Sequence, residues 1–478
     1  MAAERLTAIV GAGGAFEAPK LASVVARRLA DEIVEHRWPV GEVIGSETEL
    51  LERFGVSRAV LREAVRIIEH TGAARMRRGP GGGLVVSAPN RDAVVRAMGV
   101  WLSYVGVTLT EIIEARLPVL IAVCKLASQR IDRTGAVSLR ASVDEIIVGD
   151  DLLARRINAI EAAIADVAGN PALSLVLASV ADLGINRLRS GLSVLEPGLT
   201  TADAVAHLDG YRELVDAVAK RDGDRAAAIV TQLTEFVLTR LREGPAPRAR
   251  RASGGHDRKL AETVARALQE DIERRGWKVG DVLGSESELV EQYGVSRAIL
   301  REAVRILEHY GAVRTKRGPG GGLIVTAPDE TVLVSSARIV LEYEGVTGAQ
   351  LLEARGVIDV VAARLAALRC TAADATRLRG ALEAERRAGD AALSFMTLHD
   401  AIAATTGNRV LGLFVDLMAD LVPAHLDPGH RSPEGLAALS AEVHVVHRRI
   451  VEAIIGGDAE LAERRMARHV RASAGVLR

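Results

Sequence analysis

The chain has 478 residues, a formal net charge of −1 and 49% hydrophobic residues, while only 3% of its residues are aromatic. This length predicts roughly three or four domains. The near-zero charge excludes a whole-chain basic excess as a sign of nucleic-acid binding, so such a function must rest on local clusters. A composition rich in Ala, Leu, Val, Arg and Glu predicts a mainly α fold.

The cysteine content and the apolar runs bear on the compartment. Cys124 and Cys370 are the two cysteines, which fits a reducing compartment without disulfides. No apolar run in the sequence is long enough to cross a membrane, and the first residues lack the layout of a signal peptide. We therefore expect a cytoplasmic protein without a membrane partner.

The first elements of the chain form a helix-turn-helix pattern followed by a hairpin pattern. After residues 1–19, an expected flexible tail, a helical pattern begins at Lys20. A short helix is predicted near Ser46–Phe54, and a second follows a Gly-Val turn from Ser57 to about His70. Two β-prone runs then flank a glycine-rich tip, which predicts a hairpin.

This arrangement occurs twice. The segments Ile44–His70 and Leu283–His309 share 20 of 27 positions without gaps, and equivalent residues keep an offset of 239. The stretch between the two copies is rich in Pro, Gly, Ser and Arg, which marks a flexible linker. The rest of each copy has apolar residues at helical spacing and predicts a helical bundle of about 150 residues. The chain is a tandem duplication.

The second helix of each predicted pair carries a row of arginines. Ser57 suits the N-cap, and Arg58, Arg62 and Arg66 recur every four residues opposite the apolar stripe. Guanidinium groups in a row fit the DNA major groove, where arginine binds phosphate or the guanine edge. The alternative is a solvated face whose arginines pair with glutamates such as Glu63, but the basic hairpin and the repetition favour DNA. The glycine-rich tip lacks the Gly-Lys-Ser/Thr ending of a nucleotide phosphate loop.

These segments resemble the winged helix-turn-helix of the GntR family of bacterial transcription regulators, in its FadR-like branch. The resemblance rests on the Ser-Glu-x-x-Leu helices that start at Ser46 and Ser285, the Gly-Val-Ser-Arg-x-x-Leu-Arg-Glu-Ala runs and the Arg-Gly-Pro-Gly-Gly-Gly wings. An arginine common in the family is replaced by Thr48 and Ser287, which leaves the operator sequence open.

The resemblance and the arginine row together define the expected DNA contacts. They lie on the second helix of each motif and on each wing. The residues are Ser57, Arg58, Arg62, Arg66, Arg78 and Gly79 in the first copy, and Ser296, Arg297, Arg301, Arg305, Arg317 and Gly318 in the second.

The helical bundles resemble the FCD-type effector domain of the same branch. Such domains often hold a divalent metal with an Asp and three His, and the resemblance places His399, His447 and His469 at the histidine positions. Three neutral imidazoles suffice for a zinc-like site with open positions. Phe395 stands where the Asp is expected, so the second bundle has a three-histidine metal, another fourth ligand or no metal.

The first bundle has lost the histidine pattern. Its equivalent positions hold Glu161, Tyr211 and Leu233 or a neighbour, so no metal of this kind is expected there. In the second bundle, His425 and His444 are nearby in sequence and are alternative ligands.

The resemblance also implies an effector site. Arg116 and Arg355, each in Glu-Ala-Arg, stand where the family places the arginine that holds a carboxylate, and Asn408 is a third candidate. The alternative for each arginine is a surface salt bridge with Glu114 or Glu353. The expected effector is a small carboxylate or an acyl-CoA thioester.

The expected fold is mainly α, with two winged helix-turn-helix domains, each with a small β-hairpin wing, and two all-α effector-type bundles. The expected boundaries are 1–19 for the tail, 20–89 and 259–328 for the winged helices, 90–242 and 329–478 for the bundles, and 243–258 for the linker.

These observations predict a ligand-responsive transcription regulator, a repressor rather than an enzyme, that binds a palindromic double-stranded DNA operator through two heads. The alternatives are a metal-dependent enzyme built on the histidines of the second bundle and an architectural DNA binder without an effector. An enzyme would need a general base beside a metal-bound water, and no carboxylate stands at motif spacing to those histidines. The chain acts alone or as a homodimer of tandem chains.

Overall fold

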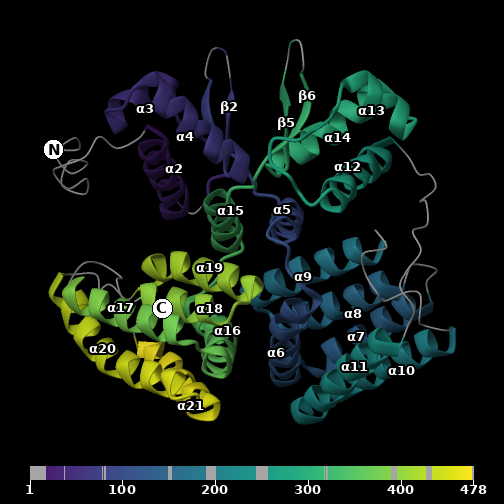
Figure 1. Cartoon of the computed structure of the whole chain (residues 1–478), viewed down its shortest axis with the longest axis vertical. Coiled ribbons are helices and arrows are strands. Elements are labelled where there is room, and N and C mark those ends of the chain that lie inside the picture. The colour runs from purple at the N-terminus through teal and green to yellow at the C-terminus, as the bar shows by residue number, and fades with distance from the viewer. Residues whose placement is uncertain are drawn as a thin grey trace. The chain divides into compact units, whose positions relative to one another are not determined.

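The computed structural model describes residues 18–36, 38–77, 79, 82–148, 153–189, 201–243, 257–316, 318, 321–388, 396–426 and 433–475. The fold is mainly α with two small antiparallel sheets, which confirms the predicted fold class (Figure 1). Within these ranges no helix combines the length and the apolar character needed to span a membrane.

The first winged helix-turn-helix, here called head 1, follows the predicted pattern. Its elements are α2 (Ala18–Glu35), β1 (Val43–Gly45), α3 (Glu47–Phe54), α4 (Arg58–Thr71), β2 (Ala74–Arg77) and β3 (Gly83–Val86). The strands form an antiparallel sheet of order β1-β3-β2. Ser46 caps α3 in a capping box with Glu49, and Ser57 caps α4. Gly55 ends α3 with a φ of 61°, so both predicted helices start and stop at local signals.

The second winged helix, head 2, repeats this arrangement. Its elements are α12 (Asp257–Arg274), β4 (Val282–Gly284), α13 (Glu286–Tyr293), α14 (Arg297–His309), β5 (Val313–Lys316) and β6 (Gly322–Val325), with sheet order β4-β6-β5. One glycine is required in each sheet. A Cβ at Gly83 would lie 2.6 Å from the carbonyl oxygen of Gly45, and a Cβ at Gly322 would lie 2.6 Å from that of Gly284. Only glycine lets these strands approach so closely.

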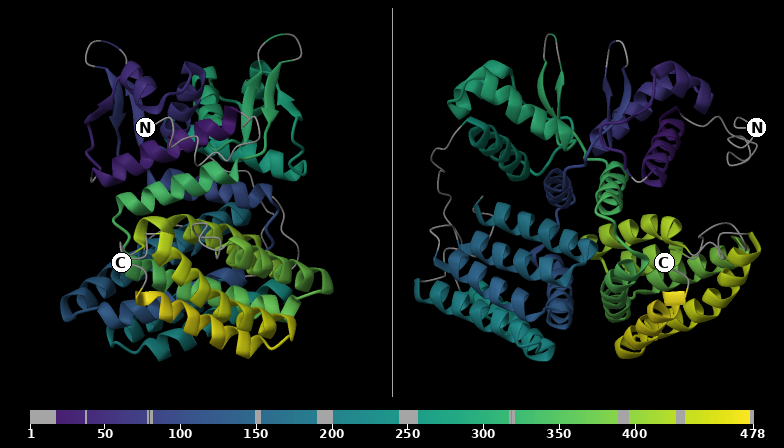
Figure 2. Two further views of the ribbon diagram at one scale, coloured as in Figure 1. Left: turned by 90° about the vertical axis from the view of Figure 1, so that its left-hand side faces the viewer. Right: turned by 180° about the vertical axis from the view of Figure 1, so that it is seen from behind.

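The remaining helices form two bundles and the segments that lead into them. Bundle 1 contains α6 (Leu109–Arg130), α7 (Arg133–Val148), α8 (Leu153–Ala168), α9 (Pro171–Arg189), α10 (Thr201–Ala219) and α11 (Gly223–Glu243), and it follows α5 (Arg91–Tyr104). Bundle 2 contains α16 (Gly348–Arg369), α17 (Ala372–Ala388), α18 (Met396–Thr405), α19 (Arg409–His425), α20 (Pro433–Ile455) and α21 (Ala459–Ala472), and it follows α15 (Glu330–Tyr343). The first helix of each bundle packs on several others, α6 on α8, α9, α10 and α11, and α16 on α18, α19, α20 and α21. Figure 2 shows bundle 1 in blue to teal and bundle 2 in green to yellow from two further sides.

Each head is completed by a helix that belongs to the other copy in sequence. α15 packs on α2 and α4 and places Ile339 in the core of head 1, while α5 places Val100 in the core of head 2. By its contacts the chain divides into two units. One unit combines the residues up to Val94 with Asp329–Val346, and the other holds head 2 and both bundles. The structural division therefore does not follow the boundary between the copies.

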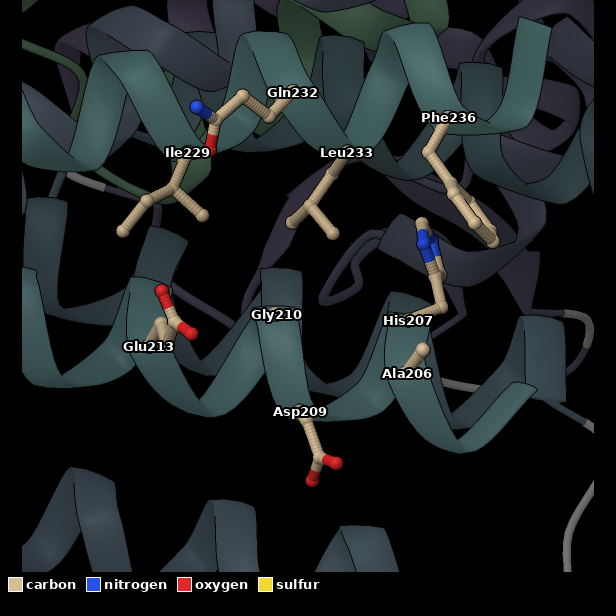
Figure 3. Close-up of a pocket in the computed structure, with 9 residues that line it drawn as sticks. All are labelled: Ala206, His207, Asp209, Gly210, Glu213, Ile229, Gln232, Leu233 and Phe236. Atoms are coloured by element: carbon tan, nitrogen blue, oxygen red, sulfur yellow. The ribbon is translucent and has the colours of Figure 1, made fainter. Parts of the chain in front are cut away.

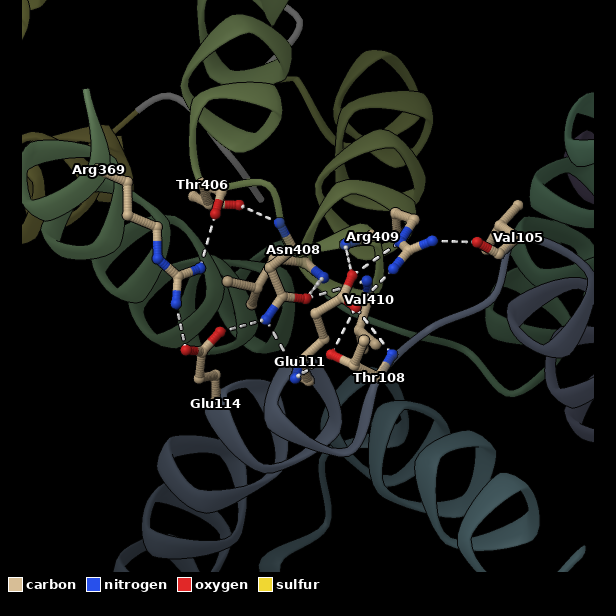
Figure 4. A network of polar contacts seen from close by, with 10 residues as sticks. Val105, Thr108, Glu111, Glu114, Arg369, Thr406, Asn408, Arg409 and Val410 are labelled. Carbon is tan, nitrogen blue, oxygen red and sulfur yellow. Dashed lines mark hydrogen bonds and ion pairs between the residues drawn. The ribbon is translucent and has the colours of Figure 1, made fainter. Parts of the chain in front are cut away.

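The two bundles meet through α6, α9, α16 and α19. The side-chain amide of Asn408 donates hydrogen bonds to the backbone oxygen of Glu111 and to the carboxylate of Glu114, both at 3.0 Å (Figure 4). Arg369 forms an ion pair with Glu114. Bundle 2 is thereby attached to the first turns of α6.

The same contacts recur with the roles of the copies reversed. The amide of Asn170 donates to the backbone oxygen of Gln350 and to the carboxylate of Glu353, both at 2.9 Å. Arg130 forms an ion pair with Glu353. An interface that uses one surface twice is the kind found in two-fold symmetric dimers. Here both partners belong to one chain.

One ion pair in this interface has no charged counterpart on the other side. The guanidinium of Arg409 donates to the carboxylate of Glu111 at 2.7 and 2.8 Å, whereas Pro171 and Gln350 stand at the equivalent positions. Burial alone would raise the pKa of Glu111, but hydrogen bonds from Arg409 and Thr108 lower it to about 2.

The lowered pKa predicts an acid-sensitive contribution to stability. Because the folded pKa of Glu111, about 2, lies below the ordinary value of 4.5, the stability that its ionised carboxylate contributes is fully present above pH 4.5. This stability is lost as the pH falls toward 2. The difference in Tm between the unmodified chain and Glu111→Gln should shrink over that interval. Glu145→Gln, at an exposed position of α7, is the control and should show no such trend. A constant difference for Glu111→Gln would contradict the assignment.

Candidate functional site

In head 1, α4 buries its apolar side and exposes the arginine row. Leu61 is fully buried where α4 packs on α2. The side chains of Arg62 and Arg66 are 74% and 80% exposed, and Arg58 is exposed as well. Arg66 lies 3.9 Å from Glu63, which is the pairing that the alternative interpretation predicts. The row as a whole still faces solvent and is available to a ligand.

Head 2 presents the same surface. Ser296 caps α14, because its hydroxyl accepts a hydrogen bond from the third residue of the helix. Arg297 is exposed, and the side chains of Arg301 and Arg305 are 65% and 75% exposed. The two heads therefore carry matched cationic rows on matched helices.

Glutamates within each head partly neutralise these rows. The guanidinium of Arg62 lies 3.4 Å from the carboxylate of Glu47, and that of Arg301 lies 3.1 Å from Glu286. Exposed ion pairs of this kind contribute little to stability. Exchange of the carboxylate for a phosphate group would therefore cost little.

The wing tips are glycines in a conformation that other residues rarely adopt. Gly79 and Gly318 have φ values of 101° and 98°. Arg75 is exposed on β2, on the arm of the hairpin that leads to the first tip. The other predicted wing contacts, Arg78 and Arg317, lie outside the described residues.

In bundle 2, the three predicted histidines come together. His399 of α18, His447 of α20 and His469 of α21 are buried, and their ligand nitrogens lie within 4.8 Å of one another. The Nε2 atoms of His447 and His469 are 3.3 Å apart. Tetrahedral zinc with Zn–N bonds of about 2.0–2.1 Å separates its ligand nitrogens by roughly 3.3 Å. The spacing therefore fits a small divalent metal.

Two carboxylates stand behind these imidazoles. Glu385 of α17 accepts a hydrogen bond from Nδ1 of His447 at 2.7 Å. Asp359 of α16 lies 3.3 Å from Nδ1 of His399, within ion-pair distance but outside hydrogen-bond geometry. A carboxylate at Nδ1 fixes the tautomer and leaves Nε2 for a metal. Neither carboxylate was predicted from the sequence, although Asp359 lies one helical turn after Arg355 and so shares its face.

The protonation of the cluster suits metal binding. Burial lowers the pKa of His447 to about 4 and that of His469 well below its usual value. Both imidazoles are therefore neutral at pH 7, and the neutral form is the one that binds a metal.

Arg355 lies beside the histidine cluster. It is 4% exposed, its Nε donates to Asp359 at 3.0 Å, and its Nη2 lies 3.4 Å from Nε2 of His399. Burial alone would raise the pKa of Asp359, but the charge of Arg355 and the contact with His399 hold it below its ordinary value. The salt bridge of Arg355 is thus buried and made with Asp359, and the surface pair with Glu353 that was the alternative is not formed.

In bundle 1, the corresponding positions form a different network. Arg116 pairs with Glu161, which stands at the position of a histidine in bundle 2, and the hydroxyl of Tyr211 donates to Glu161 at 2.5 Å. Glu161 is 3% exposed and Tyr211 is 2% exposed. The cation of Arg116 is already neutralised by a side chain of its own bundle.

A groove of about 450 Å³ lies beside this network, between α10 and α11 (Figure 3). The His207 ring stacks on Phe236 with centroids 5.5 Å apart, and burial together with the charge of Arg116 lowers the pKa of His207 to about 4. The acidic lining residues Asp209 and Glu213 each pair with an arginine of bundle 1. The lining is thus apolar and acidic, which does not favour a carboxylate ligand.

Asn408, a predicted effector contact, lies at the interface between the bundles. Its carbonyl oxygen caps α19 by accepting from two backbone N–H groups, and its NH₂ group donates to Glu111 and Glu114 across the bundle interface. The residue is 2% exposed. With its polar atoms engaged, Asn408 holds the bundles together. Glu114 and Glu353 also pair across this interface, with Arg369 and Arg130.

Comparison with protein-family models places both kinds of domain twice in the chain. The model for the FCD domain matches residues 111–236 and 350–472. The model for bacterial regulatory proteins of the gntR family matches residues 21–84 and 260–322. The matches to the gntR model cover head 1 and head 2, and the matches to the FCD model cover most of both bundles.

Similar proteins are regulators that align over less than half of this chain. The HTH-type transcriptional regulator LutR of Bacillus subtilis (strain 168) is 29% identical over 204 residues, which cover 40% of this chain and 90% of LutR. The putative L-lactate dehydrogenase operon regulatory protein of Escherichia coli (strain K12) is 27% identical over 218 residues, 45% of this chain and 84% of the relative. A solved structure of a Streptococcus agalactiae GntR protein aligns with 22% identity and a TM-score of 0.35, covering 44% of this chain and 97% of that one.

Less than half of this chain thus suffices to cover most of each curated relative, as expected when each relative carries one copy. The chain therefore belongs to the gntR family of bacterial regulatory proteins, as a ligand-responsive transcription regulator whose DNA-binding and FCD domains each occur twice.

Proposed function

We propose that the chain is a repressor that binds a palindromic operator as a single-chain pseudo-dimer, with one head on each half-site. The observation that carries this proposal is the pair of matched arginine rows on α4 and α14. A palindrome requires two equal reading heads related by a two-fold axis. The reciprocal contacts between the bundles support such a relation within one chain, so no second chain is needed.

We further propose that bundle 2 holds one divalent, zinc-like metal on His399, His447 and His469. The three imidazoles are buried, those of His447 and His469 are neutral, and carboxylates stand at Nδ1 of His447 and His399. Such a donor set fits zinc and leaves at least one coordination position open. Phe395, at the position of the missing Asp, lies outside the described residues.

The effector in this proposal is a small carboxylate held by Arg355. Its guanidinium lies 3.4 Å from His399 and is the cation nearest to the metal position among the contacts described above. The bound metal would add positive charge there, which favours an anionic ligand group. This charge arrangement supports a carboxylate over the acyl-CoA alternative. In bundle 1 Glu161 already neutralises Arg116, so we propose that bundle 1 takes neither metal nor carboxylate.

The enzyme alternative is weaker in this light. The carboxylate closest to the histidines on the α16 side is Asp359, and its pairing with Arg355 lowers its pKa. A general base must accept a proton near the working pH, and a carboxylate held in its ionised form by a buried guanidinium is a poor one. Regulation rather than turnover is the function that this site favours.

The metal proposal predicts one Zn²⁺ per chain. Isothermal titration of the full chain should give that stoichiometry, and His447→Ala should lower the affinity by about 100-fold or more, since loss of even an outer-shell partner costs 10–100-fold. His207→Ala, the same change in bundle 1, is the matched control and should leave the titration unchanged. Equal affinity in His447→Ala and the unmodified chain would refute the assignment.

The DNA proposal predicts that both heads contribute to one operator. With a duplex selected from a random pool, Arg62→Ala and Arg301→Ala should each weaken binding by about 10–100-fold, because one good arginine contact is worth about 1–3 kcal/mol. The double variant should lose more than either single variant. Binding is measured by fluorescence anisotropy.

Arg386→Ala provides the control for charge. Arg386 of α17 is 63% exposed and pairs with Glu383, so it resembles the row arginines in exposure and pairing but lies in bundle 2. Its loss should leave the affinity unchanged. If the double variant still binds the operator at full affinity, the DNA proposal is contradicted. Lack of any effect of carboxylic acids on operator binding in the presence of Zn²⁺ would favour the architectural alternative.

A further inference from the structure

The packing of α5 and α15 bears on which bundle controls which head. Ile339 of α15 is 2% exposed in the core of head 1, and Val100 of α5 is 3% exposed in the core of head 2. Arg338 of α15 also forms an ion pair with Asp31 of α2. Each head thus depends for part of its core on a helix from the other copy.

An aromatic pair marks the same exchange at both heads. Trp38 of head 1 meets Tyr343 of α15 edge-on, with ring centroids 5.4 Å apart, and Trp277 of head 2 meets Tyr104 of α5 at 5.6 Å. Both tryptophans have positive φ values, of 54° and 44°, and both indole N–H groups donate to the backbone of their own head at 2.8 and 3.0 Å. The tryptophans are therefore fixed parts of their heads, and a shift of the tyrosine acts on the body of the head.

The connections into the bundles are short. The N–H of Val346 donates back to Leu341 in α15 at 3.0 Å, and the next residue, Thr347, is the N-cap of α16. Arg355 follows about two turns later on the same helix. α5 joins α6 in the same way, with Thr108 as the cap. Residues 105–108 join α5 to α6 and residues 344–347 join α15 to α16, so each bundle has a short covalent path to the preceding helix.

We propose that the two copies control each other's heads: bundle 2 acts on head 1 through α15, and bundle 1 acts on head 2 through α5. The first turn of α5 stays with head 1, but its later turns, which lead into bundle 1, pack with head 2. All of α15 packs with head 1. The shortest covalent path from the first helix of each bundle leads to a helix that packs in the head of the other copy.

This arrangement makes the response of the chain one-sided. This consequence rests on the proposed function, which gives bundle 2 the ligand site. The crossed packing of α5 and α15 does not rest on that proposal. Glu161 keeps Arg116 of bundle 1 neutralised. A ligand therefore acts through Arg355 and α15 on head 1, while head 2 keeps its unliganded arrangement. One ligand changes one of the two half-site contacts.

The tryptophans provide a readout inside each head. The chain has three, Trp38, Trp101 and Trp277, which can be replaced by fluorotryptophan in the full chain and assigned by single Trp→Phe variants in fluorine NMR. Asp359→Asn disturbs bundle 2 beside its arginine, and Glu161→Gln is the matched change in bundle 1. Asp359→Asn should shift the Trp38 resonance and leave Trp277 in place, and Glu161→Gln should do the reverse.

The opposite pattern, or folded variants in which neither head responds, would overturn the crossed control. Tyr343→Ala should abolish the response of Trp38 to Asp359→Asn, while Tyr104→Ala should preserve it. If a variant does not fold, Zn²⁺ added to the unmodified chain is the second perturbation. A shift of the Trp38 resonance alone supports the proposal. A shift of the Trp277 resonance alone, or of neither resonance while calorimetry reports Zn²⁺ binding, overturns it. Absence of Zn²⁺ binding contradicts the metal proposal instead and leaves the two variants to decide.

Discussion

The reciprocal contact between the bundles is the interaction on which the rest of the molecule depends. Glu114 with Arg369 and Glu353 with Arg130 are one pair of positions used twice. Between separate chains such a contact forms only above a concentration set by its affinity, whereas within one chain it is an intramolecular step. The paired bundles are thus independent of protein concentration. The exchange of α5 and α15 requires this, because each head needs the other copy to complete its core.

Covalent linkage also permits the two copies to diverge. In a homodimer every substitution appears on both sides of the two-fold axis, so an ion pair gained on one side is gained on the other. Here Arg409 pairs with Glu111 on one side, while Pro171 and Gln350 stand on the other. The arginine rows of the heads stay matched, as the proposed palindromic operator requires. The bundles are under no such constraint.

Local signals made the heads predictable, while tertiary packing hid part of the site. Ser57 caps its helix and Gly55 makes the turn as their chemistry dictates. The three histidines followed from motif positions, but Asp359 and Glu385 reach the cluster from other helices, and no spacing reveals this. Nothing in the sequence indicated that Asn408 caps α19 and bonds across the bundle interface, because a buried amide can serve a helix end as well as a ligand. The exchange of α5 and α15 left no trace in the sequence, since a similar helix follows each head.

The divergence of the bundles follows from the need of a buried arginine for a carboxylate. An unpaired guanidinium in a helical core is strongly destabilising, so Arg355 is balanced by Asp359 one turn further along α16. In bundle 1 the equivalent of Asp359 is Leu120, which is 2% exposed and cannot balance Arg116. Glu161 supplies the missing charge from α8, at the position where bundle 2 has a histidine. Relocating the carboxylate and replacing the histidine are therefore one change, because a histidine at that position in bundle 1 would remove the carboxylate that pairs with Arg116.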